Sequence, residues 1–338
     1  MATICPIYAR CLAQHLLRSG VASDAIFSGT GVDYAGLWHS DELDVGTFRR
    51  LLENAEAIGT EPPVGFLIGS YHNTWVLGPL GVAMGAAPTV RASLQLLETF
   101  TRLHASYIQV ETRSSPRSLD VCVRIEGLDG DSLRHHVESS MTFIEEFICL
   151  KQGRLLEGAV YRVPYSPPEY ADDYPKYLHN QVLFDQDEIV LEIPLQDIDE
   201  PSPYFHEELW QTSLRQLADR LRKLGTVEEG VYSAHVYSLL RSHQLPLPAL
   251  GEIAESLHVS ERTLNRRLQD EGTNFRELRG RAIDRWARQY LKQTDLSVEA
   301  IAAILGYQDA ANFRRAFRKR VGMTPGQFRS EGANWNAD

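Results

Sequence analysis

The last third of the chain alternates apolar and polar positions with the spacing of helices. Within residues 247–272, two short apolar stripes follow one another, as expected for two packed helices. The stripes consist of Ile253, Ala254 and Leu257 in the first helix and Val259, Leu264 and Leu268 in the second. Residues 258–260 form a short turn between them, and Ser260 can cap a helix that opens at Glu261. The pattern predicts a helix-turn-helix unit.

A second pattern of the same kind occupies residues 296–329. Its apolar positions, which we expect to pack together, are Ile301, Ile304 and Leu305 in a short helix and Phe313 and Phe317 in the next one. Residues 305–307 supply the turn, and Asp309 is a suitable N-cap for the second helix. Two units of this kind are typical of a protein that reads double-stranded DNA.

Residues 274–294, between the two units, predict one long helix. Its apolar positions are Phe275, Leu278, Ile283, Trp286, Ala287, Tyr290 and Leu291. About twenty residues at about 1.5 Å each span roughly 30 Å, close to the roughly 34 Å between successive major grooves on one face of DNA. We therefore expect an all-α C-terminal domain in which a long helix joins two helix-turn-helix units.

The N-terminal two thirds mix helical and strand-like patterns. Helical spacing runs from residue 6 to about residue 68, and Pro62-Pro63 interrupts it. Further helices are expected after Pro88-Thr89 and at 132–153, and strands at 107–113, 119–127, 159–165, 180–185 and 188–194. The pattern predicts an α+β domain over residues 1–206 that is large enough to enclose a small-molecule pocket, but it assigns no effector-binding residues.

Residues 199–206 have the composition of a linker, and residues 207–225 predict a helix with an apolar stripe. The stripe repeats at heptad spacing through Trp210, Leu214, Leu217, Leu221 and Leu224. It can pack against its own domain or form the seam of a dimer. We therefore expect a regulatory domain at 1–206, a linker helix at 207–226 and a DNA-binding domain at 227–332.

Charge is divided unevenly along the chain. Residues 246–330 hold 15 Lys and Arg against 10 Asp and Glu, whereas the remaining residues hold 19 against 35, out of totals of 34 and 45. The net charge of −11 therefore conceals a basic C-terminal segment. This asymmetry is typical of a nucleic-acid-binding domain joined to a domain that does not bind DNA.

The second helix of each unit carries the candidate DNA contacts. In the first unit, Arg262, Asn265 and Arg266 share the face opposite the apolar stripe and can reach base edges. Thr263 and Arg267 are placed for phosphate contacts. The corresponding positions of the second unit are Ala310, Ala311, Arg314, Arg315 and Arg318. Alone, each set would suit a solvated helix face, but the turn and its repeat favour DNA contact.

The sequence gives little indication of a metal site, a catalytic site or a membrane segment. Cys5, Cys11, Cys122 and Cys149 lack metal-ligand spacing and are expected to be buried free thiols, and His135-His136 is expected to be solvated or to cap a helix. The chain contains no GxSxG, Walker or HExxH motif, so we expect no enzyme, no cofactor and no metal. It also lacks a leader-like N-terminus and an 18-residue apolar stretch, which predicts a cytoplasmic protein without membrane contact.

Residues 227–330 resemble the AraC/XylS family of bacterial transcription regulators. The most specific part is LGYQDAANFRRAFRKRVGMTPGQFR, which begins at Leu305 and includes the Gly322–Pro325 turn and Phe328. The N-terminal region resembles the arabinose-binding-like effector domain of such regulators, through LGPLGVAMGAAPTVRASLQLL and FDQDEIVLEIPLQDID. Polar residues are frequent in the family where Ala310 and Ala311 stand, so we expect the second helix to read sequence less sharply.

The resemblance implies a sequence-specific DNA-binding transcription regulator under the control of a small-molecule effector. The implied partners are double-stranded DNA, a metabolite of amino-acid or fatty-acid origin, a second copy of the chain, and RNA polymerase. Two alternatives stay open at this point. The N-terminal domain could serve dimerisation alone, or it could be an enzyme fused to a DNA-binding tail.

Overall fold

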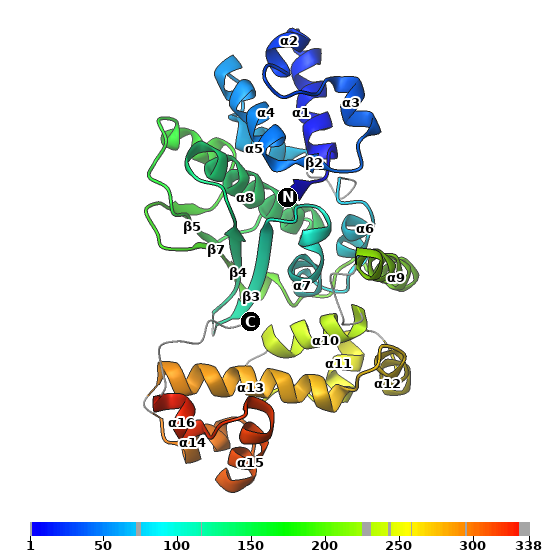
Figure 1. The fold of residues 1–338 in the computed structure, drawn as a ribbon, viewed down its shortest axis with the longest axis vertical. Coiled ribbons are helices and arrows are strands. Elements are labelled where there is room, and N and C mark those ends of the chain that lie inside the picture. The colour runs from blue at the N-terminus through cyan, green and yellow to red at the C-terminus, as the bar shows by residue number, and fades with distance from the viewer. Residues whose placement is uncertain are drawn as a thin grey trace. The chain divides into compact units, whose positions relative to one another are not determined.

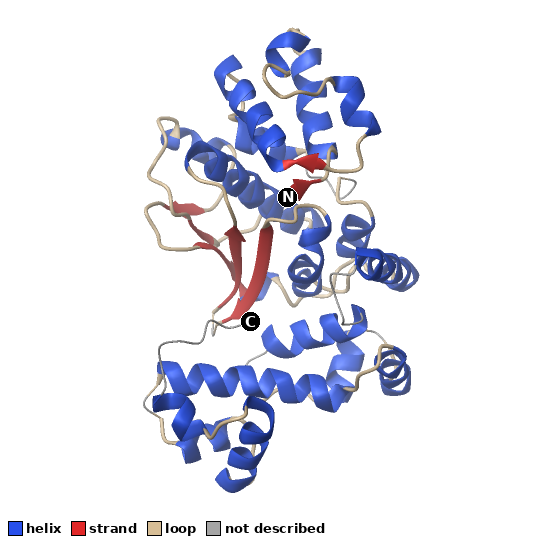
Figure 2. Ribbon diagram, in the orientation of Figure 1, coloured by secondary structure: helices blue, strands red, loops and turns tan. Residues whose placement is uncertain are grey.

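The structure, a computed structural model, describes residues 2–71, 76–115, 117–224, 231–242, 245–257, 259–294 and 296–330. The chain divides into two compact units, Met1–Val227 and Glu228–Asp338 (Figure 1). Figure 2 shows helices and strands in the first unit, and the described residues of the second form only helices, turns and loops. The expected combination of an α+β region with a helical one is confirmed.

The first unit begins with a layer of short helices. These are α1 (Ile7–Arg18), α2 (Ser23–Ile26), α3 (Tyr34–His39), α4 (Val45–Ile58) and α5 (Val64–Ser70), with β1 (Thr3–Ile4) paired to β2 (Leu43–Asp44). Asp44 caps α4 by accepting from the backbone N–H of Gly46 at 2.8 Å, and α4 ends at Gly59, whose φ of +80° favours glycine. The sequence pattern anticipated α1 and α4 but not the shorter elements.

A five-stranded sheet forms the centre of the first unit, in the order β3-β4-β7-β5-β6. The strands are β3 (Ile108–Ser114), β4 (Ser118–Ile125), β5 (Val160–Arg162), β6 (Gln181–Leu183) and β7 (Ile189–Pro194). All neighbouring pairs are antiparallel except β5 with β6. Each strand overlaps a segment that the sequence pattern predicted, and β3 and β4 each extend one residue beyond it. In β4, Leu119, Val121 and Val123 are buried at alternate positions, as the period of a strand requires.

The other helices of this unit pack around the sheet. They are α6 (Pro79–Ala86), α7 (Val90–Phe100) and α8 (Gly130–Gln152), with short 3₁₀ turns η1 (Thr101–Leu103), η2 (Ala171–Lys176) and η3 (Leu195–Asp197). Helix α5 approaches α8 closely through glycine, since a Cβ atom at Gly69 would lie 2.5 Å from the Cβ of Thr142. The buried Lys151 of α8 caps α6 by donating to the carbonyls of Met84, Gly85 and Ala87 at 2.9–3.1 Å.

Helix α9 (Glu207–Leu224) packs against α6 within the first unit. The described part of its apolar stripe, Trp210, Leu214, Leu217 and Leu221, is buried there. The segment before it, expected to be a linker, is hydrogen-bonded to the start of α7, with Ser202 donating to the Pro88 carbonyl at 2.7 Å. Of the two alternatives for this stripe, the structure shows packing against its own unit. The side chain of Leu224 lies outside the described residues.

The second unit is a bundle of short helices around one hydrophobic core. Its helices are α10 (Val231–Ser242), α11 (Leu250–Ser256), α12 (Glu261–Asp270), α13 (Phe275–Gln293), α14 (Val298–Ile304), α15 (Ala310–Val321) and α16 (Pro325–Ser330). One expectation is wrong: Ile304 is 36% exposed and does not join Phe313 and Phe317 in the core. Ala302 takes its place beside Ile301 and Leu305, because α14 is short and presents a narrow face.

Candidate DNA-binding surface and ligand pocket

Helix α12 presents the first set of predicted contacts on one face. Ser260 caps the helix by accepting from the backbone N–H of Thr263 at 3.2 Å. Leu264 and Leu268 are fully buried on the inner face. Arg262 and Arg266 are consequently exposed and Asn265 is half-buried on the other side. The structure thus brings these three side chains together as the sequence pattern expected. His258, in the turn before α12, lies outside the described residues.

The two predicted phosphate contacts of α12 are partly engaged within the protein. The Thr263 hydroxyl is 2.8 Å from the Ser260 hydroxyl at the N-cap. The guanidinium of Arg267 lies over the ring of Tyr232, 4.4 Å from its centroid. Tyr232 belongs to α10, a helix whose role the sequence analysis missed although Val236, Leu239 and Leu240 carry a helical stripe. Contact with Tyr232 therefore fixes α12 and orients Arg267.

Helix α15 presents the second set of predicted contacts. Asp309 caps it by accepting from the backbone N–H of Asn312 at 2.6 Å, as expected. Phe313 and Phe317 are buried on the inner face, while Ala311 and Arg318 are exposed and Ala310 is half-buried against the core.

The two adjacent arginines of α15 already have protein partners. Arg314 forms an ion pair with Glu299 of α14, and Arg315 donates to the side-chain oxygen of Asn312 at 2.6 Å. Both arginines are exposed, and exposed ion pairs are worth little, so a nucleic acid can compete for these side chains.

A polar contact that sequence reasoning missed ties α15 to α13. Arg320 forms an ion pair with Asp284 and donates to the Tyr307 hydroxyl at 3.1 Å. Burial raises the pKa of Asp284, and the hydrogen bond and charge of Arg320 oppose that rise. Gly280 makes room for this contact, since a Cβ atom there would lie 3.1 Å from the guanidinium. These groups are far apart in sequence, so only the fold reveals their pairing.

The first unit contains a cavity of about 110 Å³ with a mainly apolar lining. Helices α1, α4, α6, α7 and α8 and strands β3 and β4 all contribute to it. The apolar lining residues are Ile4, Phe48, Leu52, Ile68, Leu77, Leu80, Leu97, Ala105, Ile108, Val110, Val121, Val123, Phe143 and Ile144. Since many separate elements supply one or two residues each, no local sequence pattern could have named this set.

Histidines supply much of the polar part of the lining. His136 uses both ring nitrogens, at 2.7 Å from the Tyr107 hydroxyl and 2.7 Å from the Ser132 carbonyl. Burial lowers the pKa of His136 to about 4, and it lowers that of His104 to about 4 with the help of the nearby Arg220 charge. The expectation that His135 and His136 are solvated is wrong. Both are buried, because α8 has neighbours on several faces.

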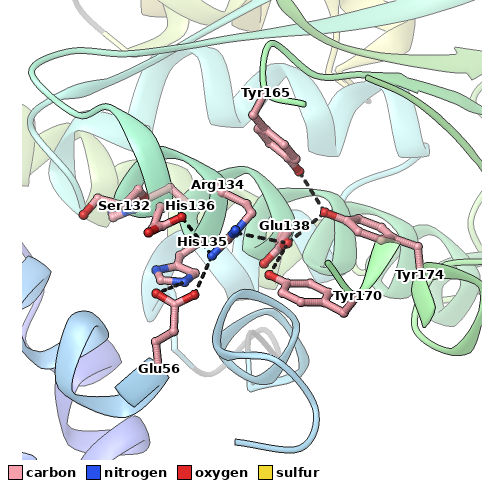
Figure 3. A network of polar contacts seen from close by, with 10 residues as sticks. Glu56, Ser132, Arg134, His135, His136, Glu138, Tyr165, Tyr170 and Tyr174 are labelled. Atoms are coloured by element: carbon pink, nitrogen blue, oxygen red, sulfur yellow. Dashed lines mark hydrogen bonds and ion pairs between the residues drawn. The ribbon is translucent and has the colours of Figure 1, made fainter. Parts of the chain in front are cut away.

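Next to the pocket, α8 carries a network of buried polar groups (Figure 3). The fully buried Glu138 accepts hydrogen bonds from the hydroxyls of Tyr170 and Tyr174 at 2.9 and 2.8 Å. Burial raises the pKa of Glu138, and the two tyrosine hydroxyls oppose that rise. On the same helix, His135 Nε2 lies 3.4 Å from a carboxylate oxygen of Glu56. The network holds the segment around η2 on α8.

Acid should destabilise the first unit. Folding lowers the pKa of His104 and His136 from 6.5 to about 4, so the unfolded chain binds more protons between these values. The free energy of unfolding is unaffected by these two histidines above pH 6.5. It decreases as the pH falls toward 4, because their side chains take up protons in the unfolded chain but stay neutral in the folded one. Between pH 7 and pH 5 we expect a loss on the order of 2 kcal/mol per histidine in the free energy of unfolding. Urea unfolding of wild type and His104→Leu would measure it. The variant should lose less, and equal losses would contradict the assignment.

The described residues also bear on the metal, thiol and membrane predictions made from the sequence. No group of three or more metal-ligating side chains is found there. The four cysteines are free thiols, of which Cys122 is buried and the others are partly exposed. In the same part of the chain, no helix is both long enough and apolar enough to span a bilayer.

Comparisons with known proteins found a matching family model for each of the two units. Residues 20–202, more than half of the chain, match the model of the arabinose-binding domain of AraC transcription regulators, and residues 253–331 match a helix-turn-helix domain. The ornithine utilization regulator of Pseudomonas aeruginosa is 27% identical over 331 residues, covering 97% of each chain. The regulator VqsM of the same organism is 24% identical, covering 79% of this chain and 83% of its own. These relatives are transcription regulators.

Solved structures of related regulators also match. The transcriptional regulator CdpR of P. aeruginosa is 24% identical, with 96% of this chain and 98% of the other covered and a TM-score of 0.49. The C-terminal domain of AraT from Geobacillus stearothermophilus is 28% identical, with 31% of this chain and 91% of the other covered and a TM-score of 0.27.

Proposed function

The chain belongs to the AraC family of DNA-binding transcription regulators, and on that premise we propose that α12 and α15 bind successive major grooves of one DNA site. The observation that carries this proposal is the exposed face of α12. There, Arg262, Asn265 and Arg266 stand opposite a fully buried apolar face on a helix with a side-chain cap. Arginine and asparagine are the side chains suited to bidentate contacts with guanine and adenine.

Helix α13 supports the proposed spacing. Its 19 residues at about 1.5 Å each span roughly 28 Å, and it packs against α10 as well as α14, α15 and α16. It can therefore act as the long helix that joins the two helix-turn-helix units and fixes their separation. The small residues Ala310 and Ala311 at the start of α15, and the engaged Arg314 and Arg315, favour a weaker sequence preference for the second unit.

We further propose that the cavity of the first unit binds a small-molecule effector. Leu77 and Leu80 line the cavity, Leu80 belongs to α6, and α6 packs against α9, the last helix of that unit. A ligand that shifts α6 would thus act on α9, which precedes the DNA-binding unit in the chain. In this proposal, residues 1–206 form the effector domain, 207–226 the linker helix and 227–332 the DNA-binding domain.

We also propose partners other than DNA. We propose that the chain binds two half-sites as a homodimer and contacts RNA polymerase, as the family resemblance implies. The name of one relative refers to ornithine utilization, which makes an amino-acid-derived effector one candidate class beside fatty-acid-derived metabolites.

Footprinting of the purified protein on its own upstream DNA, at 50 and 200 mM salt, would test the proposal. We expect two protected stretches about one helical turn apart, and affinity that falls steeply with salt because phosphate contacts release counterions. The stretches should remain distinct at the higher salt when enough protein is added. Uniform protection at low salt that vanishes at high salt would show non-specific binding and contradict the assignment of α12.

A further inference from the structure

The described lining of the cavity contains no acidic side chain and no lysine or arginine. Among the described residues that line it, none is Asp, Glu, Lys or Arg, and the polar ones are Tyr8, Thr101, Ser139, Ser140 and three histidines. A charged group moved from water into such a site loses its hydration and finds no counter-charge in the lining itself, although Arg220 lies near His104 and Glu56 contacts His135 from outside it. The site therefore disfavours a zwitterionic or dibasic ligand.

One histidine of the lining has no hydrogen-bond partner of normal geometry at either ring nitrogen among the described residues. His104 is 7% exposed, and the backbone of Leu77 lies near enough to favour its protonated form. His136, in the same lining, uses both of its nitrogens. A neutral imidazole offers one donor and one acceptor, and buried groups of this kind are normally paired. His104 therefore has more hydrogen-bonding capacity available to a ligand than the other two histidines of the described lining, because His135 contacts Glu56 through Nε2 and His136 uses both nitrogens.

The volume limits the size of the ligand. The cavity measures about 110 Å³, somewhat less than the roughly 150 Å³ of an apolar cavity that takes up benzene, so one ring is the upper limit for a ligand without rearrangement of the lining. A molecule of about that size would fill the space among Leu97, Val121 and the neighbouring side chains.

We propose that this pocket binds a small, uncharged and mainly apolar molecule, about the size of one six-membered ring, whose single hydroxyl group pairs with His104. A hydroxyl fits because it donates to one imidazole nitrogen or accepts from the other. The proposal rests on the proposed effector function of the pocket and narrows its ligand class. It also excludes ornithine itself as a ligand of this cavity, whatever the relative with ornithine in its name recognises.

Calorimetric titration of the full-length protein at pH 7 with phenol, benzene, hexanoate and ornithine would test the proposal. Phenol and benzene differ only in the hydroxyl group, so their ratio isolates its contribution. We expect phenol to bind roughly fivefold more tightly than benzene, since a buried hydrogen bond contributes about 1 kcal/mol. Hexanoate should bind more weakly than phenol, and ornithine should give no saturable heat.

Variants at His104 assign the preference to this residue. In His104→Leu, the affinity for phenol should fall to that for benzene, while benzene binding is retained. His104→Gln keeps a donor and an acceptor and should preserve part of the preference, which guards against a loss caused only by misfolding. His39→Leu, at an exposed histidine of α3 that does not line the cavity, should change neither affinity.

Three results would overturn the inference: equal affinities for phenol and benzene in the wild type, a phenol preference that survives in His104→Leu, or saturable ornithine binding that phenol displaces. Each of these leaves the footprinting result unchanged. A failed footprint with intact phenol binding would instead reject the DNA-reading assignment and leave the pocket chemistry in place.

Discussion

Replacing Arg262 and Arg266 by alanine is expected to abolish specific protection of DNA while leaving the fold intact. Both side chains are exposed on α12, so their truncation removes no core packing. Each good bidentate base contact contributes about 1–3 kcal/mol to discrimination, so the double variant should bind its specific site between roughly thirtyfold and twenty-thousandfold more weakly. Quantitative footprinting and gel-shift titration on the same DNA fragment would measure the loss.

A charge-matched variant separates base reading from general attraction to DNA. Arg276→Ala/Lys319→Ala removes the same positive charge from exposed positions on α13 and α15. It should weaken specific and non-specific binding by a similar, small factor and reduce the slope of affinity against salt. If the two double variants lost specific binding equally, Arg262 and Arg266 would be phosphate contacts, and sequence would be read elsewhere.

Replacing Trp210 by alanine is expected to destabilise the first unit by about 3–5 kcal/mol, the usual cost of truncating a fully buried tryptophan. Trp210 is 0% exposed and begins the buried stripe of α9, which packs against α6. The space left by the missing indole ring would lie between α9 and α6, the helix whose Leu80 lines the candidate pocket. Urea unfolding followed by circular dichroism would give the change in the free energy of unfolding.

Leu209→Ala is the matched control for this prediction. Leu209 is the neighbouring residue on α9 but is 48% exposed, so its truncation should change the free energy of unfolding by no more than about 0.5 kcal/mol. If Leu209→Ala were the more damaging variant, or if Trp210→Ala were harmless, α9 would not pack on α6 in solution. The stripe would then be available to a second copy of the chain.

Helical and strand periodicity were sufficient to predict most long elements. The strands β3 to β7 and the helices α8, α12 and α15 all overlap segments predicted from apolar spacing, and Ser260 and Asp309 cap the helices they were expected to cap. Each of these features depends on residues within a few positions of one another. Periodicity failed for Ile304, because a seven-residue helix has too few turns to define which side of its stripe is buried.

By itself the sequence determined the exposed face of α12 that we propose reads DNA, since this face follows directly from the burial of Leu264 and Leu268. Tertiary structure alone decided which residues surround this face and its counterpart on α15. The contact of Arg267 with Tyr232 and the pairing of Arg320 with Asp284 join residues more than thirty positions apart. The pocket and its unpaired His104 draw on helices and strands from most of the first unit. Such sites arise from packing between elements, which leaves no periodic signal in the chain.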